Sequence, residues 1–217
     1  MFEGIEVVVS TDNSFFARLA RLFGAKWTHT MLRYLIPFPY MMMAGKTYWV
    51  GKDGIYHIIE AGFRHGVVER PWNPPEYSAY AVYRLKDEYF ETGEQRADFY
   101  EHTLDFARGN LGKFYGFARL LLIIPRFLRG AVFYLAGHQT LERAVGRAEA
   151  FYGRGERYHI CSSLIDDCIT YGFYQADIRD ENGIPLDLCP NRPDIWVLPD
   201  DIAASPVLEL RNETFLL

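Results

Sequence analysis

Strand-forming segments fill the first half of the chain and helix-forming segments the second half, and this order restricts the fold more than any other feature. Short runs rich in β-branched and aromatic residues predict strands at Ile5–Ser10, Trp27–Tyr34, Lys46–Gly51, Ile55–Ala61 and Ser78–Leu85. Apolar residues at helical spacing predict helices at Asn13–Phe23, Thr92–Gly109, Phe117–Arg129, Leu141–Tyr152 and Ile160–Tyr171. Strands in one part of a chain and helices in another are typical of α+β proteins, so we predict that class.

Turn-forming and capping residues set the boundaries of these elements. Asp53-Gly54 fits a type I′ turn between two of the strands, and the prolines of Pro71–Pro75 predict a loop. Thr92 with Gln95 forms a capping-box pattern at the start of a helix. In the tail we expect a strand at Ile195–Leu198 and a short helical turn within Pro199–Pro206, with irregular structure around them.

Composition indicates one globular domain over residues 1–217. Hydrophobic residues make up 49% of the chain and aromatic residues 16%, which is enough for a substantial packed core. The formal net charge is −5 and no stretch is strongly basic, so a nucleic-acid partner is not expected.

The cysteine count and the N-terminal sequence favour a cytoplasmic protein. Three cysteines without CxxC spacing argue against a disulfide framework and against a zinc site, and no metal or other cofactor is predicted. The N-terminal MFEGIEVVVS lacks the basic and apolar regions of a signal peptide. The apolar run Ala118–Leu128 is too short to span a bilayer and contains arginines. We interpret it as a core helix, and contact with a membrane surface is the less favoured alternative.

Cys161 is the first candidate for chemistry, because the sequence changes from a polar loop to an amphipathic helix at this point. Backbone N–H groups at a helix start stabilise a thiolate and lower the pKa of a thiol. The small residues Ser162 and Ser163 leave those N–H groups accessible to a substrate oxyanion. The competing interpretation is a small buried apolar residue, which is the usual role of a free cysteine and the one that we assign to Cys168.

His29 is the candidate base, because a strand holds a side chain rigidly. A purely structural role for this histidine is the competing interpretation. Side chains alternate along the strand Ile55–Ala61, so His57 and Glu60 point to opposite faces and only one of them can orient the His29 ring. A carboxylate suits that role, which makes Glu60 the preferred third residue and His57 the alternative. His159 is too close to Cys161 in sequence to approach the thiol well, so we interpret it as structural.

The order of these motifs resembles a known superfamily. Trp27-Thr28-His29 is followed by Ile58-Ile59-Glu60-Ala61, then by Gly112-Lys113-Phe114-Tyr115-Gly116, and then by the segment Tyr158–Ile165, YHICSSLI. With histidine before cysteine, this is similar to the circularly permuted branch of the NlpC/P60 superfamily, which has a papain-like fold. That branch includes the amidase-like YiiX/YaeF proteins and, more distantly, the lecithin:retinol acyltransferase group. The resemblance covers about residues 2–86 and 109–172.

The resemblance implies an antiparallel sheet packed on helices, with Cys161 as nucleophile, His29 as base and Glu60 as third residue. It also implies that Tyr115 supports the oxyanion, although a core aromatic residue is the competing interpretation. Family members often have Glu and Asp where this chain has Ser163 and Gly116. The apolar helical stretch at about 117–158 is longer than the family pattern and is interpreted as an insertion.

The sequence therefore predicts a cysteine hydrolase, of amidase or peptidase type, or an acyltransferase. A Cys161–His29–Glu60 triad would cleave an amide or ester through an acyl-enzyme. The expected substrate is a small molecule, a lipid-like molecule or a peptide. The alternative is an inactive binding or structural module on the same fold, which the departures at Ser163 and Gly116 favour.

Overall fold

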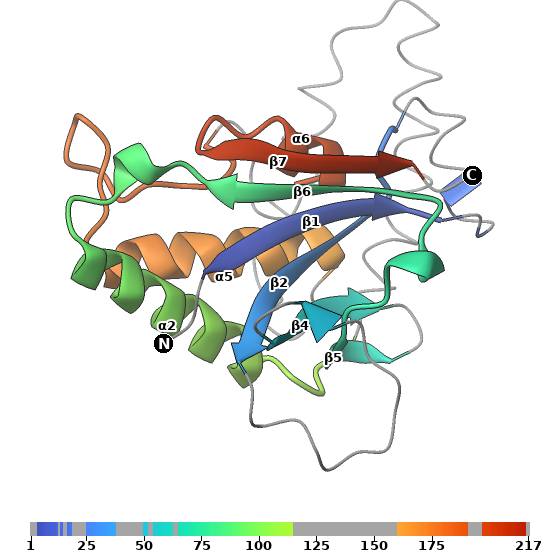
Figure 1. The fold of residues 1–217 in the computed structure, drawn as a ribbon. Coiled ribbons are helices and arrows are strands. Elements are labelled where there is room, and N and C mark those ends of the chain that lie inside the picture. The colour runs from blue at the N-terminus through green and yellow to red at the C-terminus, as the bar shows by residue number, and fades with distance from the viewer. Residues whose placement is uncertain are drawn as a thin grey trace, which may run out of the picture.

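The computed structural model describes residues 4–12, 14, 17–18, 25–37, 50–51, 54–62, 65–114, 160–190 and 197–215. Within these ranges the protein has the predicted α+β class, with an antiparallel sheet and helices packed on it (Figure 1). The strands are β1 (Ile5–Thr11), β2 (His29–Pro37), β3 (Val50–Gly51), β4 (Gly54–Gly62), β5 (Gly66–Pro71), β6 (Ala79–Leu85) and β7 (Leu208–Phe215). The helices are α2 (Gly93–Gly109), α5 (Cys161–Gln175) and α6 (Pro199–Ala203), with short 3-10 turns η1 (Pro74–Glu76) and η2 (Asp87–Tyr89).

The described strands form one seven-stranded sheet in which every pair is antiparallel. The order is β3-β4-β2-β1-β6-β7, and β5 pairs with the same strand β4 as β3 does. β1 is fully buried along its length, because β2 and β6 flank it on both sides. The N-terminal strand therefore lies in the middle of the sheet, and the C-terminal strand β7 lies at its edge.

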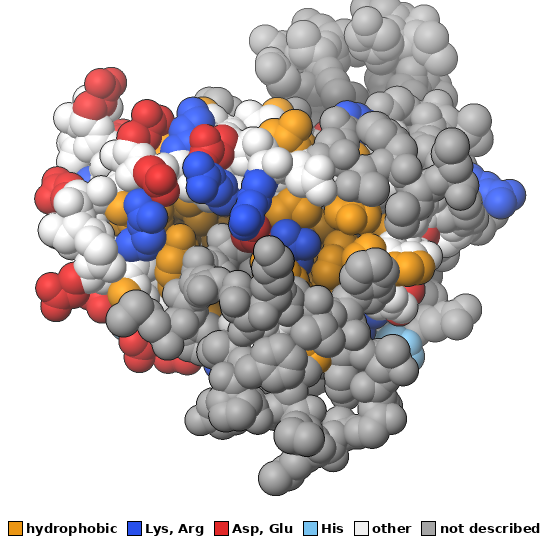
Figure 2. Space-filling view, viewed as in Figure 1, with side chains coloured by type: hydrophobic (Ala, Val, Ile, Leu, Met, Phe, Trp, Pro, Cys, Tyr) orange, Lys and Arg blue, Asp and Glu red, His pale blue; other side chains and the backbone are white. Residues whose placement is uncertain are grey.

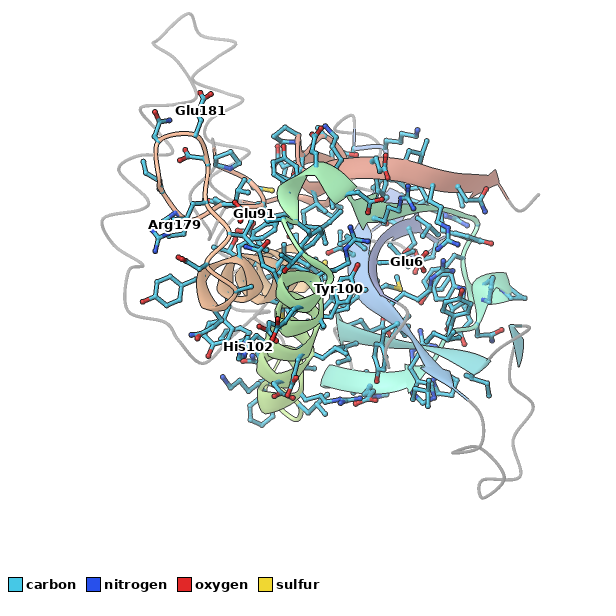
Figure 3. The ribbon with its side chains drawn as sticks, turned by 60° about the vertical axis from the view of Figure 1, so that its left-hand side comes forward. Glu6, Glu91, Tyr100, His102, Arg179 and Glu181 are labelled. Carbon is cyan, nitrogen blue, oxygen red and sulfur yellow. The ribbon has the colours of Figure 1, made fainter. Side chains whose placement is uncertain are left out.

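The two helices α2 and α5 pack against one face of this sheet. Strand residues at alternating positions, such as Val7, Leu32 and Ile59, join residues of α5 in the main apolar core. In Figure 3 the two helices lie together on one side of the strands, and Arg179 and Glu181 lie beyond them in the loop after α5. The alternation of β1, β2 and β4 thus directs one set of side chains toward α5 and the other set away from it.

The opposite face of the sheet combines apolar and charged residues. Val8, Met31 and Ile58 lie there in a second buried cluster. Figure 2 shows a row of basic side chains over hydrophobic ones on this face. The buried carboxylate of Glu6 pairs with Arg33, at 2.6 Å between Nη2 and Oε2, and with Arg211. Two arginines on one buried carboxylate neutralise a charge that burial alone would disfavour.

Helix α2 begins where the capping box was predicted. Thr92 Oγ1 accepts a hydrogen bond from the backbone N–H of Gln95 at 3.0 Å. The Gln95 side chain accepts from the N–H of Glu91, at 2.8 Å, rather than from that of Thr92 itself. The predicted helical turn after Pro199 is also present, as α6.

Other sequence predictions were wrong or fall outside the described ranges. β5 and β7 were not predicted, and Val197 and Leu198 lie outside any strand, although a strand was expected there. Of the helix predicted at Asn13–Phe23, Ala17 and Arg18 are described as helical. The helices expected between residues 117 and 152, and with them the insertion at about 117–158, lie outside the described residues. None of the described helices has the length and apolar character needed to cross a membrane.

Helices α2 and α5 pack tightly against each other at Gly172. A Cβ atom at this position would lie 2.1 Å from Thr103 Oγ1 and 2.8 Å from Phe99 Cε2. The rings of Phe99 and Phe173 pack next to this point, with centroids 5.0 Å apart. The absence of a side chain at Gly172 is therefore what allows α2 to hold α5 against the sheet.

Replacement of Gly172 by alanine should destabilise the protein. Overpacking of this kind costs about 1–3 kcal/mol of unfolding free energy, which exceeds the gain in helix propensity of about 1 kcal/mol. Gly109→Ala is the matched control, because a Cβ there meets no atom within 4 Å. Urea unfolding measures both variants, and equal stability of the two would contradict the close-approach argument.

Candidate active site

His29 and Glu60 meet across the paired strands β2 and β4. Met31 lies opposite Glu60 in the register, so His29 is the diagonal neighbour of Glu60 on the same face. His29 Nε2 lies 2.6 Å from Glu60 Oε2. This is a short, charge-assisted hydrogen bond, in which the ring N–H donates to the carboxylate. The pairing therefore leaves Nδ1 as the nitrogen available to another group.

Cys161 is the first residue of α5 and lies next to the His29 ring. The helix starts here because the carbonyl of Ile160 accepts from the N–H of Leu164, at 3.0 Å, while the Ser163 hydroxyl bonds with the backbone of Ile160. The side chain of Cys161 is nearly buried, with 5% of the residue exposed. The thiol is close enough to His29, the first residue of β2, for the two side chains to interact electrostatically. The structure thus brings together the cysteine, histidine and carboxylate that the sequence singled out.

The local field favours the ion-paired form of Cys161 and His29. Burial by itself raises the pKa of the Cys161 thiol, but the charge and hydrogen bond of His29 outweigh it and lower the pKa. The backbone N–H groups of Thr30 and Ser162 add to that lowering. Burial lowers the pKa of His29, while the Cys161 thiolate and the Glu60 carboxylate together raise it well above its ordinary value. A thiolate beside an imidazolium is the nucleophilic form of such a pair.

Glu60 is ionised despite being buried. Burial raises the pKa of this carboxyl, but His29 and Arg70 together lower it to about 2. Arg70 Nε donates to Glu60 Oε1 at 2.6 Å, so each carboxylate oxygen has a cationic partner. The carboxylate therefore keeps its negative charge next to the imidazolium at neutral pH.

His57, the alternative third residue, lies on the opposite face of β4. Its Nδ1 is 3.8 Å from Glu69 Oε1, and its ring centroid is 6.1 Å from that of Tyr34. Burial is the main cause of its lowered pKa. His57 therefore belongs to a different polar group, with Glu69 and Tyr34, because side chains alternate between the two faces of β4.

Of the residues predicted to support the oxyanion, the structure describes Ser162. The Ser162 hydroxyl donates to the carbonyl of Val197, which ties α5 to the segment before α6, while its backbone N–H faces the Cys161 sulfur. Ser162 thus contributes its backbone N–H, rather than its hydroxyl, to the surroundings of the Cys161 sulfur. Tyr115 and His159 lie outside the described residues.

The other two cysteines have the opposite electrostatic environment. Cys168 is fully buried on α5, and burial raises its pKa well above the ordinary value. Burial and nearby carboxylates also raise the pKa of Cys189. All three cysteines are free thiols, so their pKa values differ because their surroundings differ. Among the described residues no group of three or more His, Cys, Asp or Glu side chains is arranged to hold a metal ion.

Sequence reasoning missed Arg70 and the backbone N–H of Thr30. Arg70 lies opposite Ile58 across β4 and β5, which makes it the second diagonal neighbour of Glu60. Prediction of β5 as a strand, together with its register on β4, would have placed Arg70 on the face of Glu60. The N–H of Thr30 approaches the sulfur because the described pairing of β2 with β4 begins one residue later, at Met31.

Comparison of the chain with protein-family models found no match, and a search of curated proteins found none either.

Acid should remove the contribution of Glu60 to stability. Its pKa of about 2 in the folded protein lies below the ordinary 4.5, so the stabilisation is complete above pH 4.5 and is lost as pH falls toward 2. That loss is on the order of 2–3 kcal/mol. Glu60→Gln should be less stable than wild type at pH 7 and show a shallower decline between pH 4.5 and 2.

Urea unfolding at a series of pH values measures this difference. Glu88→Gln is the control, because the Glu88 carboxylate is exposed and pairs loosely with Lys86, at 3.8 Å. Wild type and Glu60→Gln with parallel acid limbs would show that the Glu60 carboxylate is not held as described.

Proposed function

We propose that this protein is a cysteine hydrolase or acyltransferase that cleaves an amide or ester through an acyl-enzyme on Cys161. The observation that carries the proposal is the joint geometry of three side chains. Cys161 at a helix start interacts electrostatically with His29, whose Nε2 lies 2.6 Å from Glu60 Oε2. This connects a nucleophile to a base, and the base to a carboxylate that orients it.

In the first half of the reaction, the Cys161 thiolate attacks the substrate carbonyl carbon. The carbonyl electron pair moves to oxygen, and backbone N–H groups at the start of α5 stabilise the oxyanion. When the intermediate collapses, the C–N or C–O bond breaks, and Nδ1 of the His29 imidazolium gives its proton to the leaving amine or alcohol. Glu60 holds the ring through Nε2 throughout, which keeps Nδ1 directed at the reacting atoms.

In the second half, a water molecule or an acceptor group attacks the thioester. Neutral His29 removes the proton of the attacking nucleophile, and the C–S bond breaks to restore the thiolate and the imidazolium. Attack by water makes the protein a hydrolase, and attack by an acceptor hydroxyl or amine makes it an acyltransferase.

The proposed fold family is the circularly permuted branch of the NlpC/P60 superfamily. The support is the order of the elements: β2 carries His29, β4 carries Glu60, and the helix that starts with Cys161 follows both and packs on the antiparallel sheet. Within that proposal the substrate is an acylated small molecule, a lipid-like molecule or a peptide. The three buried free thiols suit a reducing compartment, which supports a cytoplasmic location.

Alkylation tests the ionisation of the three cysteines in one experiment. Iodoacetamide should label Cys161 well below about pH 8, because its pKa is lowered, and should leave Cys168 and Cys189 unlabelled in the folded protein. Peptide mass spectrometry across a pH series measures each site. Slow and equal labelling of all three thiols would remove the basis of the proposal and favour a binding module.

Turnover tests the chemistry directly. Incubation with p-nitrophenyl esters of short and long acyl chains should add one acyl group to Cys161, detectable as a mass shift of the intact protein. His29→Gln should lower kcat/KM by about 10²–10⁴-fold, as expected for loss of a general base. Cys161→Ala should lose the acyl adduct, while the matched control Cys189→Ala keeps it. An adduct that persists in Cys161→Ala would contradict the assignment of the nucleophile.

A further inference from the structure

Arg70 lies beside the three residues of the proposed site but has no part in the reaction described above. It belongs to β5, pairs with Ile58 across β4, and shares a face of the sheet with Glu60. Its side chain is 31% exposed, whereas that of Glu60 is 10% exposed. Arg70 thus contacts one oxygen of the Glu60 carboxylate, and His29 contacts the other oxygen.

Every nitrogen of the Arg70 guanidinium has a hydrogen-bond acceptor. Nε donates to Glu60 and Nη1 to Glu76, each at 2.6 Å, and Nη2 donates to the Tyr77 hydroxyl at 2.9 Å. Tyr77 in turn stacks on Trp72, with ring centroids 5.0 Å apart. A planar guanidinium that meets three acceptors in three directions has one orientation in which all are satisfied, so Arg70 is held rigidly.

This rigid group determines how Glu60 is oriented. Glu60 Oε1 accepts from Arg70 and Oε2 pairs with His29, and both distances are 2.6 Å. Rotation of the carboxylate would break both bonds at once. Arg70 therefore assigns Oε2 to the His29 ring and fixes the direction of that hydrogen bond.

Arg70 also completes the charge of the buried cluster. A Cys161 thiolate, a His29 imidazolium and a Glu60 carboxylate together carry one net negative charge, and Arg70 brings the sum to zero. Among the described residues, the other groups in contact with the cluster are uncharged, namely the backbone N–H groups of Thr30 and Ser162 and the Tyr77 hydroxyl, which accepts from Arg70. Glu76 is 44% exposed at its side chain, so water screens its charge. Uncompensated charge in a buried site is costly, so the neutral sum favours the ion-paired form of Cys161 and His29.

We propose that Arg70 is a positioning residue of this site, which acts through Glu60 to keep the His29 ring oriented and the Cys161 thiol ionised. The proposal rests on the proposed function. It assigns the enzyme a line of four alternating charges on four elements, Cys161 of α5, His29 of β2, Glu60 of β4 and Arg70 of β5. A structural role alone would stabilise η1 and leave the chemistry of Cys161 unchanged.

The test measures the rate of Cys161 alkylation against pH in the full-length chain. Arg70→Gln should raise the midpoint by about one pH unit, which is about a tenfold slower labelling below the midpoint. Arg70→Lys restores the charge and should show less than half of that shift. Arg84→Gln is the control: it removes an arginine from an ion pair with Glu209 in which both side chains are exposed, and it should leave the midpoint unchanged.

A double-mutant cycle separates action through Glu60 from a general effect of charge. In the Glu60→Gln background, Arg70→Gln should cause less than half of the shift that it causes in wild type. An equal shift in both backgrounds, or none in wild type, would overturn the role of Arg70 while low-pH labelling of wild-type Cys161 still supports the proposed function. Absence of low-pH labelling in wild type would overturn both. Circular dichroism checks folding, and if Arg70→Gln does not fold, Arg70→Lys is judged by the same cycle.

Discussion

The antiparallel pairing of β2 with β4 is the constraint on which the site depends. Its register puts Met31 opposite Glu60, and this makes His29 the diagonal neighbour of the carboxylate. A slip of one residue would turn Glu60 to the other face, where Tyr34 and Glu69 interact with each other. Because both faces carry buried apolar clusters, such a slip would also move the core residues of β4 into the cluster on the wrong face, where the packing does not fit them. Packing of the sheet thus enforces the alignment that the site needs.

The two faces of β4 separate two polar groups that use similar residues. On one face His29, Glu60 and Arg70 form a line that ends at the Cys161 thiol. On the other face His57 lies beside Glu69, away from that thiol. The first histidine has its pKa raised by two anionic neighbours, while the second has its pKa lowered mainly by burial. The pKa values of the two histidines therefore differ because His29 has more anionic neighbours close by than His57 has.

The sequence predicted those parts of the structure that local rules determine. Alternation along β4 selected Glu60 over His57, and the change from loop to amphipathic helix placed Cys161 at a helix start. β5 was not predicted because Glu69, Arg70 and Pro71 give it the composition of a loop, and two of its charged residues pair with Glu60 and Arg108 on other elements. β7 was not predicted either, because an edge strand pairs on one side only and tolerates polar residues along its length. Contacts between distant segments therefore account for what local patterns did not reveal.

Cys161 lies far along the chain from the two residues that surround it in the site. His29 and Glu60, on β2 and β4, are synthesised early, while the helix that carries the Cys161 thiol follows much later. Contacts between such distant segments form late in folding, since the loop between them must first be closed. A nascent or unfolded chain thus carries three ordinary thiols, and the pKa of one of them is lowered only when α5 docks on the sheet. The distinct pKa of Cys161 is in this sense a property of the completed fold, because residues far apart in the sequence produce it.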